Sequence, residues 1–188
     1  MRLIILGPPG AGKGTQAARI AQRLSIPAIS TGDIFRSNIK NQTELGRRVE
    51  TILASGRYVP DEMTNEIVDD RLTWPDAENG FLLDGYPRTA PQVEALETML
   101  ARRGHALDAV LELTVDEESV VERLLKRAVT EGRADDTEEV IRERQQIYRR
   151  ETAPLADHYR RAGLLVQVNG MGVVDEVTDR VIEALPAR

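Results

Sequence analysis

The nine residues GPPGAGKGT, from Gly7 to Thr15, constrain the fold of this chain more than any other stretch. They follow the short apolar run Leu3–Leu6 and lead into Gln16–Ala21, which has the pattern of an amphipathic helix. A strand, a glycine-rich turn and a helix start form a cradle for phosphate. The glycines let successive backbone N–H groups turn inward, and the helix N-terminus adds partial positive charge. Lys13 adds an ammonium for terminal phosphates, so the stretch predicts a nucleotide site.

One position departs from the usual pattern of such loops, G-x-x-x-x-G-K-[ST]. Gly14 follows Lys13 where a metal-binding hydroxyl is normally found, and Thr15 comes one place later. The prediction therefore depends on the loop lysine and on the strand and helix that flank it.

Composition narrows the class of protein. With 188 residues, 41% apolar and 30% charged, the chain is expected to form one soluble core domain, residues 1–188. No stretch approaches the length of a membrane span, and the first strand begins at once, so neither a membrane partner nor a signal peptide is expected. The absence of cysteine excludes disulfides and thiolate zinc sites, and favours a cytoplasmic protein. The net charge of −6 argues against a nucleic-acid partner, and a monomer is the default because no helix pairs with itself.

Short apolar runs alternate with helical patterns along the whole chain. This predicts an α/β fold, a five-stranded parallel sheet flanked by helices, in which ligands bind beyond the carboxyl ends of the strands. The expected strands are Arg2–Leu6, Ala28–Ser30, Phe81–Asp84, Ala109–Val115 and Leu164–Val168. The expected helices are 14–24, 33–40, 43–55, 61–73, 90–103, 117–128, 137–161 and 173–185.

Polar residues follow the second and third strands. Thr31 and Asp33 have the side chains of helix N-caps, while Arg36, one turn later, either faces an anion at that sheet edge or is solvated. Asp84 ends a buried strand beside the phosphate loop. It either orients magnesium-bound water or caps the Gly–Pro turn that follows. Arg88 lies on that turn with no packing role, which favours a place in the site.

The segment between these strand ends, residues 37–60, contains two helix-like pieces and little continuous apolar surface. Either a mobile helical flap or a packed layer fits this pattern.

Later arginines complete the set of candidate cations. Arg123 and Arg127 lie four residues apart, hence on one helix face, Arg133 follows Gly132, and Arg144 belongs to the next helix. Each of these four arginines, taken alone, is expected to be solvated or paired with a nearby glutamate.

Taken together, the motifs resemble those of adenylate kinases, which are nucleoside monophosphate kinases, and the resemblance runs from residue 1 to about 185. The matching motifs are GPPGAGKGTQ at 7–16, STGDIFR at 30–36, DGYPRT at 84–89, Gln92, Arg123 with Arg127, RADD at 133–136, VIRER at 140–144 and TAPL at 152–155. That family also carries a glycine at the position of Gly14 and binds magnesium largely through water.

The resemblance implies a P-loop NTPase type of fold and a residue set for each substrate of a reversible phosphoryl transfer from ATP–Mg²⁺ to AMP that gives two ADP. The ATP set is Gly10, Ala11, Gly12, Lys13, Gly14, Thr15, Arg123, Arg127 and Gly172. The AMP set is Thr31, Arg36, Arg57, Tyr58, Val59, Gly85, Tyr86, Pro87, Arg88, Gln92, Arg133 and Arg144. The catalytic cations would be Lys13, Arg88, Arg123, Arg127, Arg133 and Arg144, with Asp84 and Asp33 holding magnesium through water.

The resemblance also implies two closing segments: an AMP-binding flap at 30–59 and a lid at 127–133. Longer relatives insert a small domain between the arginines at the positions of Arg127 and Arg133, whereas only five residues separate them here. A short lid without structural zinc is therefore expected.

Two other readings stay open at this point. A pyrimidine monophosphate kinase would share the loop, the flap and the arginines, but typically has a smaller residue at Thr31 and a different amide at Gln92. A GTP-dependent switch protein would need a guanine-reading N-K-x-D motif, and the sequence contains none.

Overall fold

The computed structural model of the chain describes residues 1–116, 120, 123–124 and 137–186. A five-stranded parallel sheet lies at its centre in the order β2-β3-β1-β4-β5. The strands are β1 Arg2–Leu6, β2 Ala28–Ser30, β3 Phe81–Asp84, β4 Ala109–Thr114 and β5 Leu165–Asn169. The predicted strands are confirmed, the last two with ends shifted by one residue.

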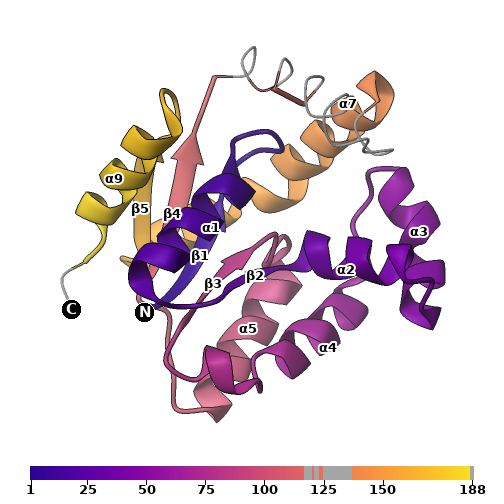
Figure 1. Ribbon diagram of the computed structural model, residues 1–188, viewed down its shortest axis with the longest axis horizontal. Coiled ribbons are helices and arrows are strands. Elements are labelled where there is room, and N and C mark those ends of the chain that lie inside the picture. The colour runs from indigo at the N-terminus through magenta and orange to yellow at the C-terminus, as the bar shows by residue number, and fades with distance from the viewer. Residues whose placement is uncertain (117–119, 121–122, 125–136, 187–188) are drawn as a thin grey trace.

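Alternating side chains of each strand supply the two faces of the sheet with apolar surface. Leu3 and Ile5 of β1 pack with α1 (Lys13–Leu24) and α9 (Val174–Ala184) on one face. Ile4 and Leu6 pack on the other face with α4 (Asp61–Arg71), α5 (Ala90–Arg102) and α8 (Leu155–Arg161). Figure 1 shows α1 and α9 side by side over one face. The sheet is therefore buried on both sides, as its near-continuous apolar strands indicate.

Helices α2 (Thr31–Lys40) and α3 (Glu44–Ala54) project away from the sheet at the right of Figure 1. They share a small core of their own, built around Phe35, Val49 and Val59. A Cβ atom on Gly46 would lie 2.1 Å from the Asn38 carbonyl oxygen, so only glycine lets the two helices approach this closely. Met63 and Ile67 of α4 also pack against this core, so residues 37–60 form a packed layer together with the start of α2.

Two predicted helices require correction. The single helix expected at 137–161 is divided into α7 (Glu138–Ile147), a π-helical turn η2 (Tyr148–Thr152) and α8. Pro154 has no N–H to continue the hydrogen-bond ladder, and the wider turn before it absorbs the break. The cap of α2 is Ser30, whose hydroxyl accepts from Asp33 N at 3.3 Å; neither Thr31 nor Asp33 caps it.

Other differences are smaller. A one-turn 3₁₀ helix, η1 (Pro75–Ala77), was not predicted. Of the predicted helix 117–128, only residues 120, 123 and 124 are described. Within the described part of the chain, no helix is both long enough and apolar enough to cross a membrane.

Candidate active site

The phosphate loop joins β1 to α1 through three glycines with positive φ: Gly7, Gly10 and Gly12. A Cβ atom on Gly10 would lie 2.9 Å from Leu124 Cγ, so the loop also needs glycine there for space. Lys13 Nζ donates to the carbonyl oxygens of Gly7 (2.7 Å) and Pro8 (3.0 Å). The loop thus holds its own ammonium at the start of α1, where the helix dipole also favours anions.

Gly14 faces the carboxylate that ends β3. A Cβ atom there would lie 3.6 Å from Asp84 Oδ2, in ordinary van der Waals contact, so the start of α1 lies close to Asp84. Asp33 lies near the same edge with its carboxylate exposed, and it accepts from Arg36 at 2.5 Å. Among the described residues, no group of three or more acidic, histidine or cysteine side chains is placed to hold a metal directly. Asp84 and Asp33 both line the space beside the phosphate loop, and carboxylate oxygens are the type of donor that Mg²⁺ prefers.

Arg88 is held by hydrogen bonds and by an aromatic ring. Its Nε donates to Gly85 O (2.7 Å), its backbone N–H donates to Gln92 Oε1 (2.7 Å), and its carbonyl accepts from Thr152 Oγ1 (2.8 Å). The Tyr58 ring lies under its guanidinium, 4.9 Å from the guanidinium carbon. These contacts fix the direction of the guanidinium before any ligand binds.

Gly85 makes this arrangement sterically possible. It has φ +79°, and a Cβ atom would lie 2.9 Å from both a terminal nitrogen of Arg88 and Thr31 Oγ1. Thr31 Oγ1 donates to Gly85 O at 2.9 Å, so toward the pocket this hydroxyl offers only lone pairs.

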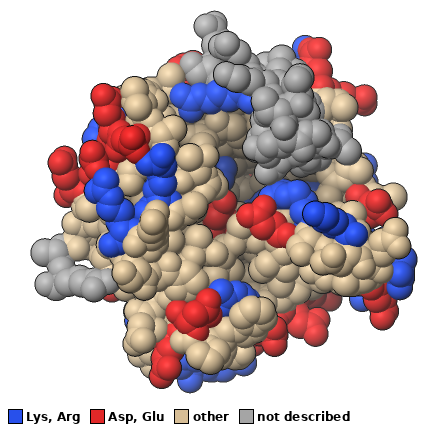
Figure 2. Space-filling model, in the orientation of Figure 1, with Lys and Arg blue, Asp and Glu red and all other residues tan. Residues whose placement is uncertain are grey.

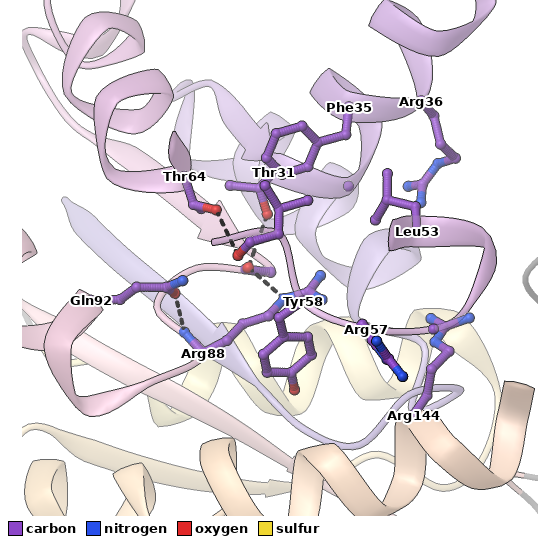
Figure 3. Close-up of a pocket in the computed structure, with 14 residues that line it drawn as sticks. Thr31, Phe35, Arg36, Leu53, Arg57, Tyr58, Thr64, Arg88, Gln92 and Arg144 are labelled. Atoms are coloured by element: carbon purple, nitrogen blue, oxygen red, sulfur yellow. Dashed lines mark hydrogen bonds between the residues drawn. The ribbon is translucent and has the colours of Figure 1, made fainter. Parts of the chain in front are cut away.

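A pocket lies between the α2–α3 pair, the start of α5 and Arg144 of α7 (Figure 3). Its lining combines an apolar wall from Phe35, Leu53 and Val59 with polar side chains that converge on the interior. The remaining lining residues are Thr31, Gly32, Arg36, Gly56, Arg57, Tyr58, Thr64, Gly85, Arg88, Gln92 and Arg144. A pocket with one apolar wall and several convergent polar and cationic side chains can hold a flat polar ring that carries an anionic group.

Two residues expected in this pocket lie elsewhere. Tyr86 is buried behind it, where its hydroxyl donates to Asn65 Oδ1 (2.7 Å). Burial, with smaller contributions from the Asp61 and Asp69 carboxylates, raises the pKa of this hydroxyl well above its ordinary value. Pro87 lines a neighbouring cavity that reaches Lys13. Both support the pocket from outside its lining.

A larger cleft of ≈ 620 Å³ connects the pocket to the phosphate loop. Figure 2 shows the hollow in the middle of this face, bordered by blue Lys and Arg side chains. Arg88 and Arg144 line both the cleft and the pocket, and the cleft brings together Lys13, Asp33, Arg36, Asp84, Arg88, Arg123 and Arg144. Charged residues from three helices (α1, α2 and α7), from the end of β3, from the loop after it and from Arg123 thus surround one space.

The loop after β5 lies beside Arg123. A terminal nitrogen of Arg123 is 3.7 Å from Met171 Sδ, and Arg180 of α9 donates to the carbonyl oxygens of Asn169 and Met171. Gly172, in the same loop, has φ +112°. Arg127, Arg133 and the expected lid at 127–133 lie outside the described residues.

Sequence reasoning missed two residues that support the site. Asp61 accepts from Gln92 Nε2 at 2.7 Å, and Thr152 bonds to Arg88 and Tyr58. Asp61 follows Pro60 and has the pattern of an ordinary acidic first turn, and Thr152 lies inside a predicted helix. Neither position carries a local signal of its partner far along the chain.

The family model and the similar proteins that match this chain carry the same description. The family model described as adenylate kinase matches residues 5–164. The adenylate kinase of Clavibacter michiganensis is 59% identical over 187 residues, covering 100% of this chain and 94% of the relative. That of Leifsonia xyli is 59% identical (99% and 94% covered), and that of Thermobifida fusca is 53% identical over the full length of both.

Proposed function

The chain belongs to the adenylate kinase family, and from that premise we propose how its residues divide the work of phosphoryl transfer. The reaction is the reversible conversion of ATP and AMP into two ADP, and nothing in the comparisons favours a pyrimidine acceptor.

The donor ATP is assigned to the phosphate loop. The backbone of Gly10, Ala11, Gly12, Gly14 and Thr15 would surround the β- and γ-phosphates. Lys13, now bonded to two loop carbonyls, would turn to the transferred group. Arg123, on the Met171 side of the cleft, would pair with the ATP phosphates, and the Gly172 loop would offer backbone to adenine. Arg127 is assigned here by resemblance alone.

The acceptor AMP is assigned to the pocket of Figure 3. Gln92 and Thr31 would contact the base, the backbone of Arg57, Tyr58 and Val59 would line its edge, and Arg36 and Arg88 would bind the α-phosphate. Arg36 would exchange its present partner, Asp33, for that phosphate. Arg133 and Arg144 would reach the acceptor from the lid side.

The single observation that carries this division is that Arg88 and Arg144 line both the pocket and the cleft above Lys13. Phosphoryl transfer needs little covalent help. It needs two oxygens in line with phosphorus and cations around the charge spread over the equatorial oxygens. Arginines that line both sites would place positive charge beside the acceptor oxygen and the transferred phosphoryl group at the same time. The planar guanidinium suits this role because it binds phosphate in a bidentate manner. No protein base is required, because a phosphate oxygen of AMP is itself the nucleophile.

Mg²⁺ bound with ATP would supply positive charge that offsets the charge of the phosphates. Asp84, which lies close to Gly14 in the cleft, would hold water of that ion, with Asp33 as a second contact. The flap at 30–59 and the lid at 127–133 would close over the site and exclude water, which otherwise would hydrolyse ATP. The cytoplasmic location and the monomeric state expected from the sequence remain predictions.

A bisubstrate analogue tests the two-site arrangement. Two adenosines joined by five phosphates should bind at least a hundredfold more tightly than ATP, since one molecule fills both sites and loses its freedom only once. Calorimetry on wild type and on Arg88→Ala gives the comparison. An affinity no greater than that of ATP would contradict the proposal.

A further inference from the structure

Gln92 is the buried amide expected to contact the base, and both ends of its side chain already have partners. It is 1% exposed. Its Nε2 donates to Asp61 Oδ1 at 2.7 Å, and its Oε1 accepts from Arg88 N at 2.7 Å. One N–H and one lone pair of the amide remain for a ligand.

The partners fix which way the amide points. A carboxylate oxygen only accepts, so it requires the NH₂ end, and a backbone N–H only donates, so it requires the oxygen end. Rotating the amide by 180° would set oxygen against oxygen at Asp61 and two donors against each other at Arg88. Thr89 strengthens the arrangement, because its hydroxyl donates to the same Asp61 oxygen (3.0 Å) and accepts from Gln92 N (3.3 Å).

This orientation matters because a freely rotating amide cannot distinguish adenine from hypoxanthine. The two bases have nearly the same shape. Adenine carries a donor at position 6 beside an acceptor ring nitrogen, whereas hypoxanthine carries an acceptor at position 6 and a donor at N1. An amide could meet either base by turning over. An amide held in one orientation matches one base and leaves buried groups unpaired against the other.

We infer that Asp61 is a positioning residue for acceptor specificity: by holding the Gln92 amide in one orientation, it makes the site select AMP over inosine monophosphate. This rests on the proposed role of Gln92 at the base. Asp61 itself does not line the pocket, so it acts through Gln92. The backbone N–H of Arg88 holds the oxygen end of the Gln92 amide and cannot be removed by a side-chain substitution. Asp61 holds the NH₂ end, and its side chain can be replaced.

The test compares kcat/KM for AMP and for inosine monophosphate at saturating ATP–Mg²⁺. Wild type should prefer AMP by at least about a hundredfold, as a site built on paired hydrogen bonds does. Asp61→Asn keeps the shape but can present either an oxygen or an NH₂ to Gln92, so only the Arg88 N–H still holds the amide in its orientation. The AMP preference should fall about tenfold or more, chiefly through the two acceptor KM values, while the KM for ATP stays within about twofold. Glu62→Gln, at the exposed acidic residue next to Asp61 in the first turn of α4, is the matched control and should behave as wild type.

Two further variants separate the possible failures. In a Gln92→Leu background, Asp61→Asn should no longer change the AMP preference, because the group it positions is gone. If Gln92→Leu leaves the KM for AMP unchanged, the proposed role of Gln92 fails. If Gln92→Leu raises that KM but a folded Asp61→Asn keeps the wild-type preference, only the role of Asp61 fails. Should Asp61→Asn not fold, Asp61→Glu replaces it, since it keeps the charge but displaces the carboxylate. A wild-type preference for AMP below tenfold overturns the inference without any variant.

Discussion

The guanidinium carbon of Arg88 lies 4.9 Å from the centre of the Tyr58 ring, so the segment after α3 meets the turn after β3 through a cation–π contact. The hydroxyls of Tyr58 and Thr152 form a second connection between Tyr58 and Arg88. Thr152 gives its single proton to Arg88 O, so the 2.8 Å contact between Tyr58 and Thr152 has the tyrosine as donor. Tyr58 therefore supports Arg88 both directly, through its ring, and indirectly, through Thr152.

Substitutions of Tyr58 separate these two contributions. Tyr58→Ala removes the ring beneath a partly buried guanidinium and should lower kcat/KM for AMP about tenfold, whereas Tyr58→Phe, which loses only the hydroxyl, should lower it about threefold. Steady-state kinetics with AMP varied, and circular dichroism as a folding control, check this. Tyr58→Ala with wild-type kinetics would show that Arg88 needs no support from the flap.

Lys13→Met should abolish most activity while leaving the fold intact. Removing one preorganised cation from a transition state typically lowers the rate about 10²–10³-fold, and the hydrogen bonds of Lys13 to Gly7 O and Pro8 O stay within its own loop. Lys40→Met, at the exposed end of α2, is the matched control. A coupled assay measures the rate, and thermal melting checks the fold. If Lys13→Met keeps more than about a tenth of the wild-type rate, Lys13 does not have the assigned role.

Gly46→Ala should weaken the binding of AMP much more than the binding of ATP. The new Cβ would lie 2.1 Å from the Asn38 carbonyl oxygen, so α2 and α3 must separate, at a stability cost of about 1–3 kcal/mol. The KM for AMP should rise more than about tenfold, with much less change in the KM for ATP. Gly104→Ala is the control, because its φ of +69° makes alanine strained while no atom lies within 4 Å of the new Cβ. Equal effects of the two substitutions on the KM for AMP would mean that the flap does not need the close helix contact.

Activity should require added Mg²⁺, whereas stability should not depend on any bound metal. Without nucleotide, the melting temperature should be the same with and without chelator. Asp84→Asn should raise the Mg²⁺ concentration needed for half-maximal rate, because it weakens the hold on magnesium-bound water. Stoichiometric zinc in the purified protein, or a large melting shift on chelation, would refute this.

The sequence predicted the sheet and the phosphate loop well because both rest on local patterns. Apolar runs such as Leu3–Leu6 are buried in parallel strands whatever their neighbours, and Gly10 and Gly12 adopt backbone angles that side chains disfavour. Arg36, Arg88, Arg144 and Lys13 were recognised through motifs and do meet at one cleft.

What the sequence could not predict depends on contacts between distant segments. Asp61 bonds to Gln92, 31 residues later, and Tyr58 reaches Thr152 across 94 positions. The break after Ile147 was missed because the apolar spacing continues through Tyr148 to Leu155. Pro154 indicates an interruption, but the contact of Thr152 in η2 with Arg88 could not be predicted from the sequence.

Product analysis with each nucleoside monophosphate shows whether AMP is the preferred phosphoryl acceptor. Purified enzyme receives ATP–Mg²⁺ with AMP, CMP, UMP or GMP in turn, and chromatography follows every nucleotide over time. We expect rapid formation of two ADP for each AMP consumed, and turnover of the other three acceptors lower by about a hundredfold or more. The reason is that the base would meet the oriented Gln92 amide and the lone pairs of the Thr31 hydroxyl. Turnover of CMP or UMP as fast as that of AMP would contradict this expectation.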